Sequence, residues 1–365
     1  MTIRKTEFLL FSDFHAHNFP FGSKRVPIDG FEGLFNSRLR DAADVLDYIH
    51  GYALDRDVRH VLFGGDLFHR RSSVDTDVRA VVVDRLISMA QSGQDALQLG
   101  LLTGNHDFGD KFGEIHSLFG LNEVRNVTVH DCLSTKEVGH VLLVMVPFTP
   151  SLDKAKRCLE EAGRIADRHR VSTGNPSILL AHLGMQGAKV GSDYVLIQDS
   201  DIQEADVPHD SFVACFFGHY HEHQKIFKNG WFIGASHEHS WTDTGGTRGF
   251  LHVKVIDDRV TFERIETSAP KFVTIVEGDP MPYTRPNDFV KLVGSQEYLA
   301  ATDIPAADIQ RIEHTDATEV DFQLDVGKLN PEETLRVWAA AYCPPDLSLS
   351  EVIKEGVSAL TKVSP

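Results

Sequence analysis

Cysteine is scarce in this sequence. Only 4 of the 365 residues are cysteine, and their positions follow neither a metal-binding nor a redox spacing. They are Cys132, Cys158, Cys215 and Cys343. The scarcity argues against a thiolate metal site. It fits a reducing, cytoplasmic location in which the thiols act as small apolar side chains.

Long apolar runs are also missing. The hydrophobic share is 42%, enough for a full core in one large and one smaller domain. No stretch approaches the roughly 18 uninterrupted apolar residues that a membrane span needs. The N-terminal run in "MTIRKTEFLLFSDFH" is short and is followed at once by Asp13, so we predict a first strand rather than a signal peptide.

Positive charge is in deficit. Lysine and arginine number 36 against 53 aspartate and glutamate residues, which gives a net charge of −17. Proteins that bind DNA alone usually present a basic face, because neutralising phosphates supplies much of the affinity. The composition therefore weighs against tight DNA binding by this chain alone. Basic clusters do remain at residues 21–25, 36–40 and 69–71.

Metal-ligand residue types, by contrast, recur in five separated segments. Most of these segments follow a short apolar run, as in "HVLFGGD", "SILLAH" and "FVACFFGHYH". They are Asp13-Phe14-His15, Gly65-Asp66, Gly104-Asn105-His106-Asp107, Ala181-His182 and Gly218-His219-Tyr220-His221. Short buried strands bounded by glycine predict a central sheet, and residues at the strand ends converge on one edge.

Seven of these side chains can donate oxygen or nitrogen to a cation. They comprise two carboxylates, one amide and four imidazoles: Asp13, Asp66, Asn105, His15, His182, His219 and His221. This number suffices for two cations that share a bridging ligand. A set without thiolate favours manganese, iron or zinc over a sulfur-rich structural zinc site. Such a pair lowers the pKa of a bound water and clamps phosphate oxygens, which are the two things that hydrolysis of a phosphoester needs.

The ordered set resembles the calcineurin-like metallophosphoesterase superfamily, whose motifs run D-x-H, G-D, G-N-H-[DE], H and G-H-x-H. Protein phosphatases of this superfamily show G-D-x-V-D-R-G at the second motif. Here "GGDLFHRR" places His69 three residues after Asp66, which resembles the DNA-repair nucleases: SbcD and the nuclease subunit of the double-strand-break repair complex. The stretch 231–255 resembles them too. The chain length suits the compact phage recombination endonuclease subunits, which would place the protein in the host cytoplasm.

The resemblance implies a fold and a domain order. The fold is a four-layer α/β/β/α metallophosphoesterase sandwich with a small C-terminal capping region and a terminal helical pair. We expect the nuclease domain at 1–268, the capping domain at 269–328 and the helical pair at 329–365. That pair either packs back on the domain or docks on the partner ATPase. Hydrophobic periodicity independently predicts helices at 39–57, 75–93 and 151–170, the last with Ser151 as its N-cap.

The resemblance also implies how the metal ligands are divided between the two metals. Asp13, His15, Asp66 and His221 would hold one metal, and Asp66, Asn105, His182 and His219 the other. Asp66 follows a glycine pair that permits a tight turn, and is the natural bridging ligand. Manganese is the expected metal in both positions, with magnesium, iron or zinc as alternatives.

Catalytic roles follow from the same resemblance. His106, beside a ligand, would be the general acid for the leaving 3′-oxygen, a role suited to a pKa near 7. His69 would orient the phosphate or stabilise the transition state. Asp107 would orient His106.

Two pairs of residues near the motifs have open alternatives. Arg70 and Arg71 either contact the DNA backbone or begin a solvated helix. His237 and His239 either line a substrate groove or lie exposed.

The predicted activity is metal-dependent DNA exonuclease or endonuclease cleavage, as the nuclease subunit of an SbcCD-like repair or recombination complex. Its partners would be DNA, an SbcC-like coiled-coil ATPase and a second copy of the chain. One alternative is a phosphodiesterase or phosphomonoesterase for small substrates with the same dimetal centre. Another is a non-catalytic scaffold, which the intact ligand set disfavours. Metal content distinguishes the scaffold from both enzymes.

Overall fold

Two six-stranded sheets form the centre of the protein. The computed structural model describes residues 3–109, 115–190, 194–195, 202–306, 308–313 and 353–354. The first sheet has the order β16-β15-β1-β4-β5-β6. Its strands are β1 (Lys5–Phe11), β4 (His60–Phe63), β5 (Gln98–Leu102), β6 (Val127–His130), β15 (Gly249–Ile256) and β16 (Arg259–Glu266). β1, β4, β5 and β6 are parallel, whereas β15 runs antiparallel to β1 and to β16.

The second sheet has the order β13-β14-β12-β9-β8-β7. Its strands are β7 (Ser134–Val138), β8 (Val141–Val146), β9 (Ser177–His182), β12 (Ala214–Gly218), β13 (Gln224–Phe227) and β14 (Gly230–Phe232). The four inner strands are parallel, and an antiparallel strand closes each edge. Parallel strands end at the same side of a sheet, so residues that follow them gather at one rim.

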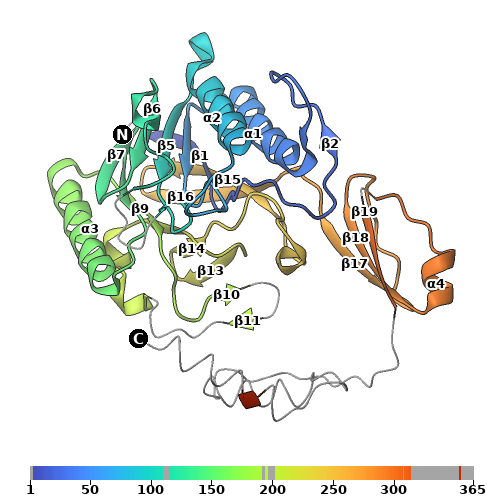
Figure 1. Ribbon diagram of the computed structural model, residues 1–365. Helices are drawn as coiled ribbons and strands as arrows, with labels where there is room; N and C mark the ends of the chain where they lie inside the picture. Colours follow the sequence, from blue (N-terminus) through green and yellow to red (C-terminus); the bar gives the residue numbers. More distant parts are fainter. Residues whose placement is uncertain are drawn as a thin grey trace. The chain divides into compact units, whose positions relative to one another are not determined.

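Helices cover the outer faces of the two sheets, with α1 and α2 on one side and α3 on the other (Figure 1). The described helices are α1 (Ser37–Asp55), α2 (Thr76–Gln91), α3 (Leu152–Thr173) and the short α4 (Gln296–Ala301). The three predicted long helices are confirmed. Ser151 caps α3 by accepting a hydrogen bond from the backbone N–H of Lys154, as predicted.

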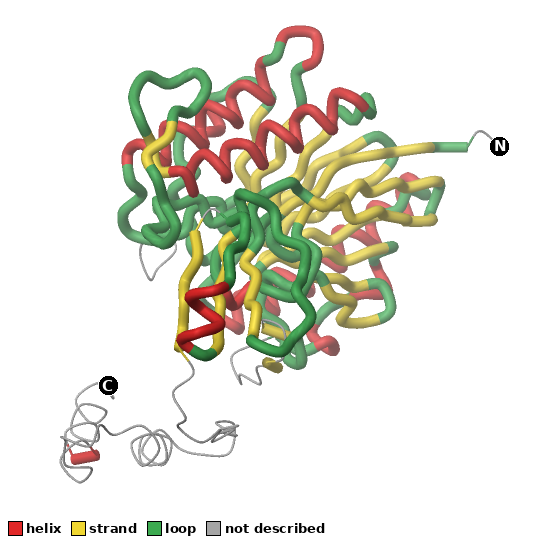
Figure 2. The backbone as a smooth tube through the Cα atoms, turned by 90° about the vertical axis from the view of Figure 1, so that its right-hand side faces the viewer, coloured by secondary structure: helices red, strands yellow, loops and turns green. Residues whose placement is uncertain are grey.

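Alternation along the strands builds the layers. In β1, Leu9 and Phe11 pack with the apolar faces of α1 and α2, whereas Phe8 and Leu10 pack with residues of the second sheet. A third cluster joins the second sheet to α3. Figure 2 shows the strands lying between the helical layers. The predicted four-layer α/β/β/α sandwich is confirmed.

A small parallel sheet follows the sandwich in the chain. Its order is β17-β18-β19, with β17 (Phe272–Val276), β18 (Phe289–Gly294) and β19 (Asp308–Glu313). It has its own apolar cluster with α4. The predicted terminal helical pair at 329–365 lies outside the described residues except for 353–354, and the predicted domain boundaries stay predictions.

Shorter elements complete the described chain. The two-stranded pairs are β2 (Arg25–Val26) with β3 (Phe35–Asn36), and β10 (Lys189–Val190) with β11 (Tyr194–Val195). The 3-10 turns are η1 (Gly93–Asp95), η2 (Leu121–Glu123), η3 (Glu204–Asp206), η4 (His209–Ser211) and η5 (Trp241–Asp243). In the part of the chain that the structure describes, no helix is long and apolar enough to cross a membrane.

Candidate metal centre

The seven predicted metal ligands lie at the rim where the strands of both sheets end. Those after β1, β4 and β5 come from the first sheet, and those at the ends of β9 and β12 come from the second. Asp13 and His182 are fully buried, and His219 and His221 are partly exposed. The structure brings all seven together. Their roles as ligands stay a prediction.

Four of these residues have a left-handed backbone, which L-amino acids rarely adopt. The φ angles are +51° for Asp13, +46° for His15, +64° for Asp66 and +108° for His219. Backbone hydrogen bonds hold the turns: Asp13 N–H donates to the carbonyl of Gly65 at 2.9 Å, and His15 N–H to that of Asp66 at 3.0 Å. Strain of this kind persists where the surrounding structure fixes it and is concentrated at functional sites.

Asp66 lies between two imidazoles. Its Oδ2 is 3.6 Å from Nε2 of His15 and 3.4 Å from Nε2 of His182. Ligand atoms of Asp13, His15 and His221 lie within 4.8 Å of one another, and so do those of Asp13, Asp66 and His182. This central position suits the bridging role expected of Asp66.

Asn105 completes the second group. Its Oδ1 is 3.0 Å from Nε2 of His182 and 2.8 Å from Nδ1 of His219. The amide oxygen and the two imidazoles therefore converge beside Asp66, in the grouping that the resemblance implies for the second metal.

Neighbouring groups orient two of the imidazoles. Nδ1 of His182 donates to the carbonyl of Gly64 at 2.7 Å, and Nδ1 of His221 donates to Oδ1 of Asp243 at 2.8 Å. When the imidazole is neutral, a hydrogen bond donated by Nδ1 leaves the lone pair of Nε2 for a metal. Both side chains are thus prepared as Nε2 ligands.

The electrostatics of the rim favour added positive charge. Burial raises the pKa of Asp13 to about 6, although His182 and His221 oppose the rise. Burial would lower the pKa of His182, but Asp66, Asp13 and the carbonyl of Gly64 together outweigh it, and the pKa rises to about 9. Among the described residues, the buried Oδ2 of Asp13 has no hydrogen-bond partner. Buried carboxylate, amide and imidazole donors of this kind fit two divalent cations.

His106 and His69 adjoin the ligands. Nδ1 of His106 donates to the carbonyl of His69 at 2.6 Å, and the two rings are stacked with centroids 5.7 Å apart. The backbone N–H of His106 donates to Oδ1 of Asp66 at 2.7 Å. Nε2 of His106 is therefore the nitrogen left to exchange a proton with substrate. Burial, with smaller contributions from His106 and His17, lowers the pKa of His69 to about 4.

The hydrogen bonds of Asp107 differ from the predicted contact with His106. Its carboxylate does not hold His106 but turns beneath the second motif, where it accepts hydrogen bonds from backbone N–H groups at 2.9 to 3.0 Å. The donors are Asp66, Leu67 and Gly104. The side chain of Asp107 therefore fixes the turn that carries Asp66, while the backbone of His69 orients His106.

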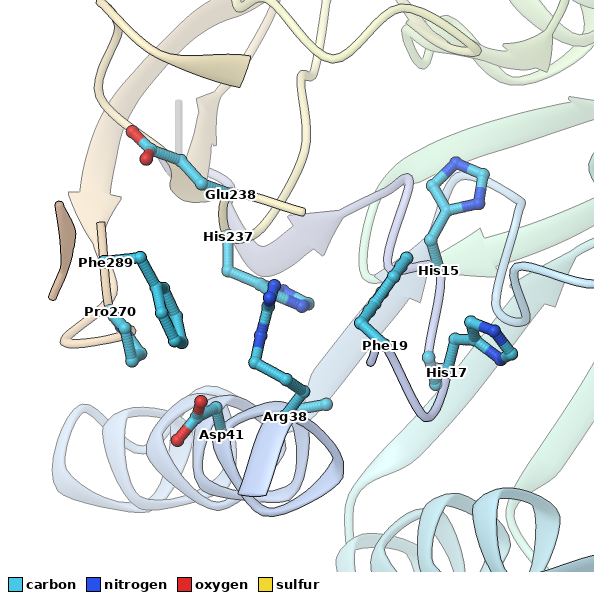
Figure 3. Close-up of a pocket in the computed structure, with 11 residues that line it drawn as sticks. His15, His17, Phe19, Arg38, Asp41, His237, Glu238, Pro270 and Phe289 are labelled. Carbon is cyan, nitrogen blue, oxygen red and sulfur yellow. The ribbon is translucent and has the colours of Figure 1, made fainter. Parts of the chain in front are cut away.

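His237 and His239 are buried, each with 6% of its surface exposed, so the exposed alternative is excluded. Their rings lie against Phe14 and His15, respectively, at 5.2 Å between centroids. His237 lines a small cavity together with His15 and Arg38 (Figure 3). Arg70 and Arg71 are exposed, and their contact with DNA stays a prediction.

Sequence reasoning missed two residues near the ligands. Asp243 holds His221, and the buried Arg38 donates to the carbonyl of His239 at 3.1 Å. The only sequence signal for Asp243 is its place three residues after Ser240, which is the spacing of a capping box. Arg38 lies in an amphipathic helix, where an arginine predicts an exposed position.

The calcineurin-like phosphoesterase family model matches residues 6–223. The chain belongs to this family. A curated relative, "Putative phosphoesterase 244L" of Invertebrate iridescent virus 6, is 23% identical over 194 residues, which are 52% of this chain and 62% of the relative. The match thus spans less than two thirds of that relative. Family membership and the converging donor set are the two findings on which the proposed function rests.

Solved structures that are similar to the chain include phosphatases and phosphoesterases. A dimetal phosphatase from Danio rerio has a TM-score of 0.43 at 12% identity, covering 71% of this chain and 95% of its own. The calcineurin-like phosphoesterase YfkN from Bacillus subtilis has a TM-score of 0.40 at 13% identity, covering 73% and 94%.

Proposed function

We propose that this phosphoesterase hydrolyses phosphodiester bonds of DNA. The observation that carries the proposal is the pair of stacked imidazoles, His69 and His106, beside the ligands. His69 belongs to the segment "GGDLFHRR", in which the chain resembles the DNA-repair nucleases rather than the protein phosphatases. A second imidazole at this position offers a contact to a phosphate oxygen in addition to the acid.

Each residue then has a chemical task. Two divalent cations bound to the seven donors would neutralise the phosphate and lower the pKa of a water molecule. His106 protonates the leaving 3′-oxygen through Nε2 while the carbonyl of His69 holds Nδ1. With its lowered pKa, His69 is neutral at pH 7 and donates one N–H to a phosphate oxygen.

Affinity for DNA requires a partner in this proposal, because the chain carries a net charge of −17. An SbcC-like coiled-coil ATPase that grips the duplex supplies the missing positive charge. A homodimer, with the helix at residues 35–50 as the contact, would place two such centres on one DNA. Arg70 and Arg71 are the exposed cations next to His69 and are proposed to contact the backbone of the bound strand.

The test is a cleavage assay with manganese on end-labelled double-stranded and single-stranded DNA. The purified chain is compared with an Asn105→Ala, His106→Ala double variant. Cleavage by the unmodified protein and none by the variant is expected. Hydrolysis of bis(p-nitrophenyl) phosphate without DNA cleavage, even with the ATPase supplied, would overturn the DNA assignment and leave the metal centre intact.

That outcome would favour the second candidate, a phosphodiesterase or phosphomonoesterase for small substrates. The net charge is the observation on its side, because a small substrate needs no extended basic surface. A scaffold without turnover is disfavoured, since all seven donors converge at one rim. It would release no product from any phosphoester and would have no need for two bound ions.

A further inference from the structure

Residues 238–243, here called the linking segment, contact both the rim of the sandwich and the small sheet. The segment follows β14 in sequence and ends with η5. Its residues Glu238, His239 and Asp243 are each at least 94% buried. The segment contains no predicted metal ligand, yet some of its side chains contact ligands and others contact the strands of the small sheet.

Two residues of the linking segment, Asp243 and His239, hold two of the predicted metal ligands. Oδ1 of Asp243 accepts the Nδ1–H of His221 at 2.8 Å. Its Oδ2 accepts the backbone N–H of His239 at 2.9 Å and that of Ser240 at 3.3 Å. Nε2 of His239 donates to the backbone carbonyl of Asp13 at 3.0 Å. Both ligands that the segment holds belong to the first metal group.

Arg248 holds the backbone of Asp243 and His221 in place. It is 4% exposed, and its guanidinium donates to the carbonyl of Asp243 at 3.1 Å and to that of His221 at 2.6 Å. It also pairs with Glu222 at 2.9 Å. The carboxylate of Asp243 therefore has little freedom to move away from the imidazole.

Two other side chains of the segment, those of Glu238 and Trp241, contact β17 and β18. Oε2 of Glu238 accepts the backbone N–H of Phe272 at 2.6 Å. The ring of Trp241 lies edge-on to Phe272 at 4.4 Å, and Nζ of Lys291 lies 4.9 Å from the centre of the indole. These contacts attach the segment to the first and the middle strand of the small sheet.

Arg38 of α1 strengthens the same junction. It donates to the carbonyl of His239, and its guanidinium lies 4.9 Å from the ring of Phe272 and 4.6 Å from that of Phe289. Figure 3 shows Arg38 passing between Phe19 and Phe289 toward His237. The backbone of the linking segment is thus fixed by a cation that itself packs on the small sheet.

We propose that Asp243 is a positioning residue for His221, and that the linking segment couples occupancy of the first metal position to the packing of the small sheet. Coupling between two sites is reciprocal. Metal binding therefore stabilises the small sheet, and loosening the sheet weakens metal binding. A partner that moves β17 or β18 would change metal affinity without touching a ligand. The proposal rests on the metal centre and not on DNA as the substrate.

The variant Asp243→Asn tests whether Asp243 positions His221, because the hydrogen-bond donors around residue 243 fix how the new amide is turned. The backbone N–H groups of His239 and Ser240 require an oxygen at one side of the amide, which turns the NH₂ group toward His221. Nδ1 of His221 must then accept, so the proton moves to Nε2, the nitrogen needed for the metal. We expect one of two manganese ions to bind 10- to 100-fold more weakly in a titration followed by calorimetry.

The matched control is Asp131→Asn, which alters another histidine contact, Asp131 to Nε2 of His116 at 3.3 Å. It should bind both ions as the unmodified protein does. Nitrogen NMR of the imidazoles reports the tautomer of His221 directly, a change that a merely structural role would not produce. Two ions bound with unchanged affinity by a folded Asp243→Asn variant would overturn the positioning role.

The coupling is tested by hydrogen exchange of residues 272–276 and 289–294 with and without manganese. We expect manganese to slow exchange there at least several-fold in the unmodified chain and to have no such effect in Asp243→Asn. Trp241→Leu, which alters no ligand, should weaken binding of one manganese ion, whereas Trp231→Leu in β14 should not. Exchange of the small sheet that is independent of manganese in the unmodified chain would refute the coupling.

Discussion

The carbonyl oxygen of His69 lies 2.6 Å from Nδ1 of His106. His69, which is three positions after the predicted ligand Asp66, thus orients His106, which directly follows the predicted ligand Asn105. Because a backbone carbonyl can only accept, Nδ1 of His106 keeps its proton and every proton exchanged with substrate passes through Nε2. This relationship makes the role of His106 testable by the choice of leaving group.

His106→Ala should lower the turnover of DNA, or of another ester with an alkoxide leaving group, by about 10²- to 10⁴-fold. Hydrolysis of bis(p-nitrophenyl) phosphate should fall far less, because nitrophenolate leaves without protonation. Steady-state rates on both substrates measure the difference. His209→Ala, on η4 away from the motifs, is the control. An equal loss on both substrates would show that His106 serves the metals rather than the leaving group.

Asp66→Asn and Asn105→Ala should differ in metal content. Asp66 lies between His15 and His182, so its loss removes a ligand common to both groups, and we expect neither ion to survive gel filtration. Asn105 lies within hydrogen-bond distance of His182 and His219, both of the second group, so its loss should release one ion. Elemental analysis of the filtered proteins gives the counts. Equal metal content in the two variants would contradict a bridging Asp66.

Gly65→Ala should destabilise the protein more than Gly93→Ala. Both glycines have positive φ, +106° and +71°, but a methyl group at Gly65 would overlap the imidazole of His182, while that at Gly93 meets nothing within 4 Å. We expect a loss of about 1 kcal/mol at Gly93 from backbone strain alone. At Gly65 we expect about 3 kcal/mol or more, with loss of bound metal. Urea denaturation measures both, and similar losses would exclude the overlap.

The raised pKa of Glu238 predicts that its contribution to the free energy of unfolding depends on pH. Burial raises its pKa to about 7, while Phe272 N–H and Arg248 oppose the rise. A carboxyl whose folded pKa exceeds its unfolded value stabilises the fold fully below the unfolded pKa, and this stabilisation is lost as pH rises through 7.

Glu238→Gln keeps an oxygen for Phe272 N–H without the charge. The variant should match the unmodified protein near pH 4.5 and exceed its free energy of unfolding by on the order of 2 kcal/mol at pH 8. Comparing the two proteins cancels the titration of all other groups. A difference that does not change with pH would show that Glu238 ionises normally in the fold.

The sequence predicts the rim because its information there is local. Each ligand follows an apolar strand within a few residues, and parallel strands carry such residues to one edge, so Asp13, His182 and His219 could be placed together. Asp107 could not be assigned by the same reasoning. Adjacent residues on a tight turn point in different directions, and its carboxylate turns back under Asp66 instead of toward His106.

Residues that act across long separations could not be predicted. Asp243 meets His221 only after the chain has passed through β13 and β14. Arg38 lies 201 positions from the carbonyl to which it donates. The solvent-facing pattern expected for an arginine in a helix fails there because Phe272 and Phe289 cover it. Such contacts depend on tertiary packing, for which periodicity carries no signal.

The origin of the ligands in both sheets has a mechanical consequence. Between the sheets, many of the contacts are made by apolar side chains such as Phe8, Leu10 and Phe216, and contacts without direction resist sliding only weakly. A cation held by Asp13 of the first sheet and His221 of the second would link the two sheets at the rim. The force needed to shear the sandwich should therefore rise with metal occupancy, most steeply along the rim where the chemistry takes place.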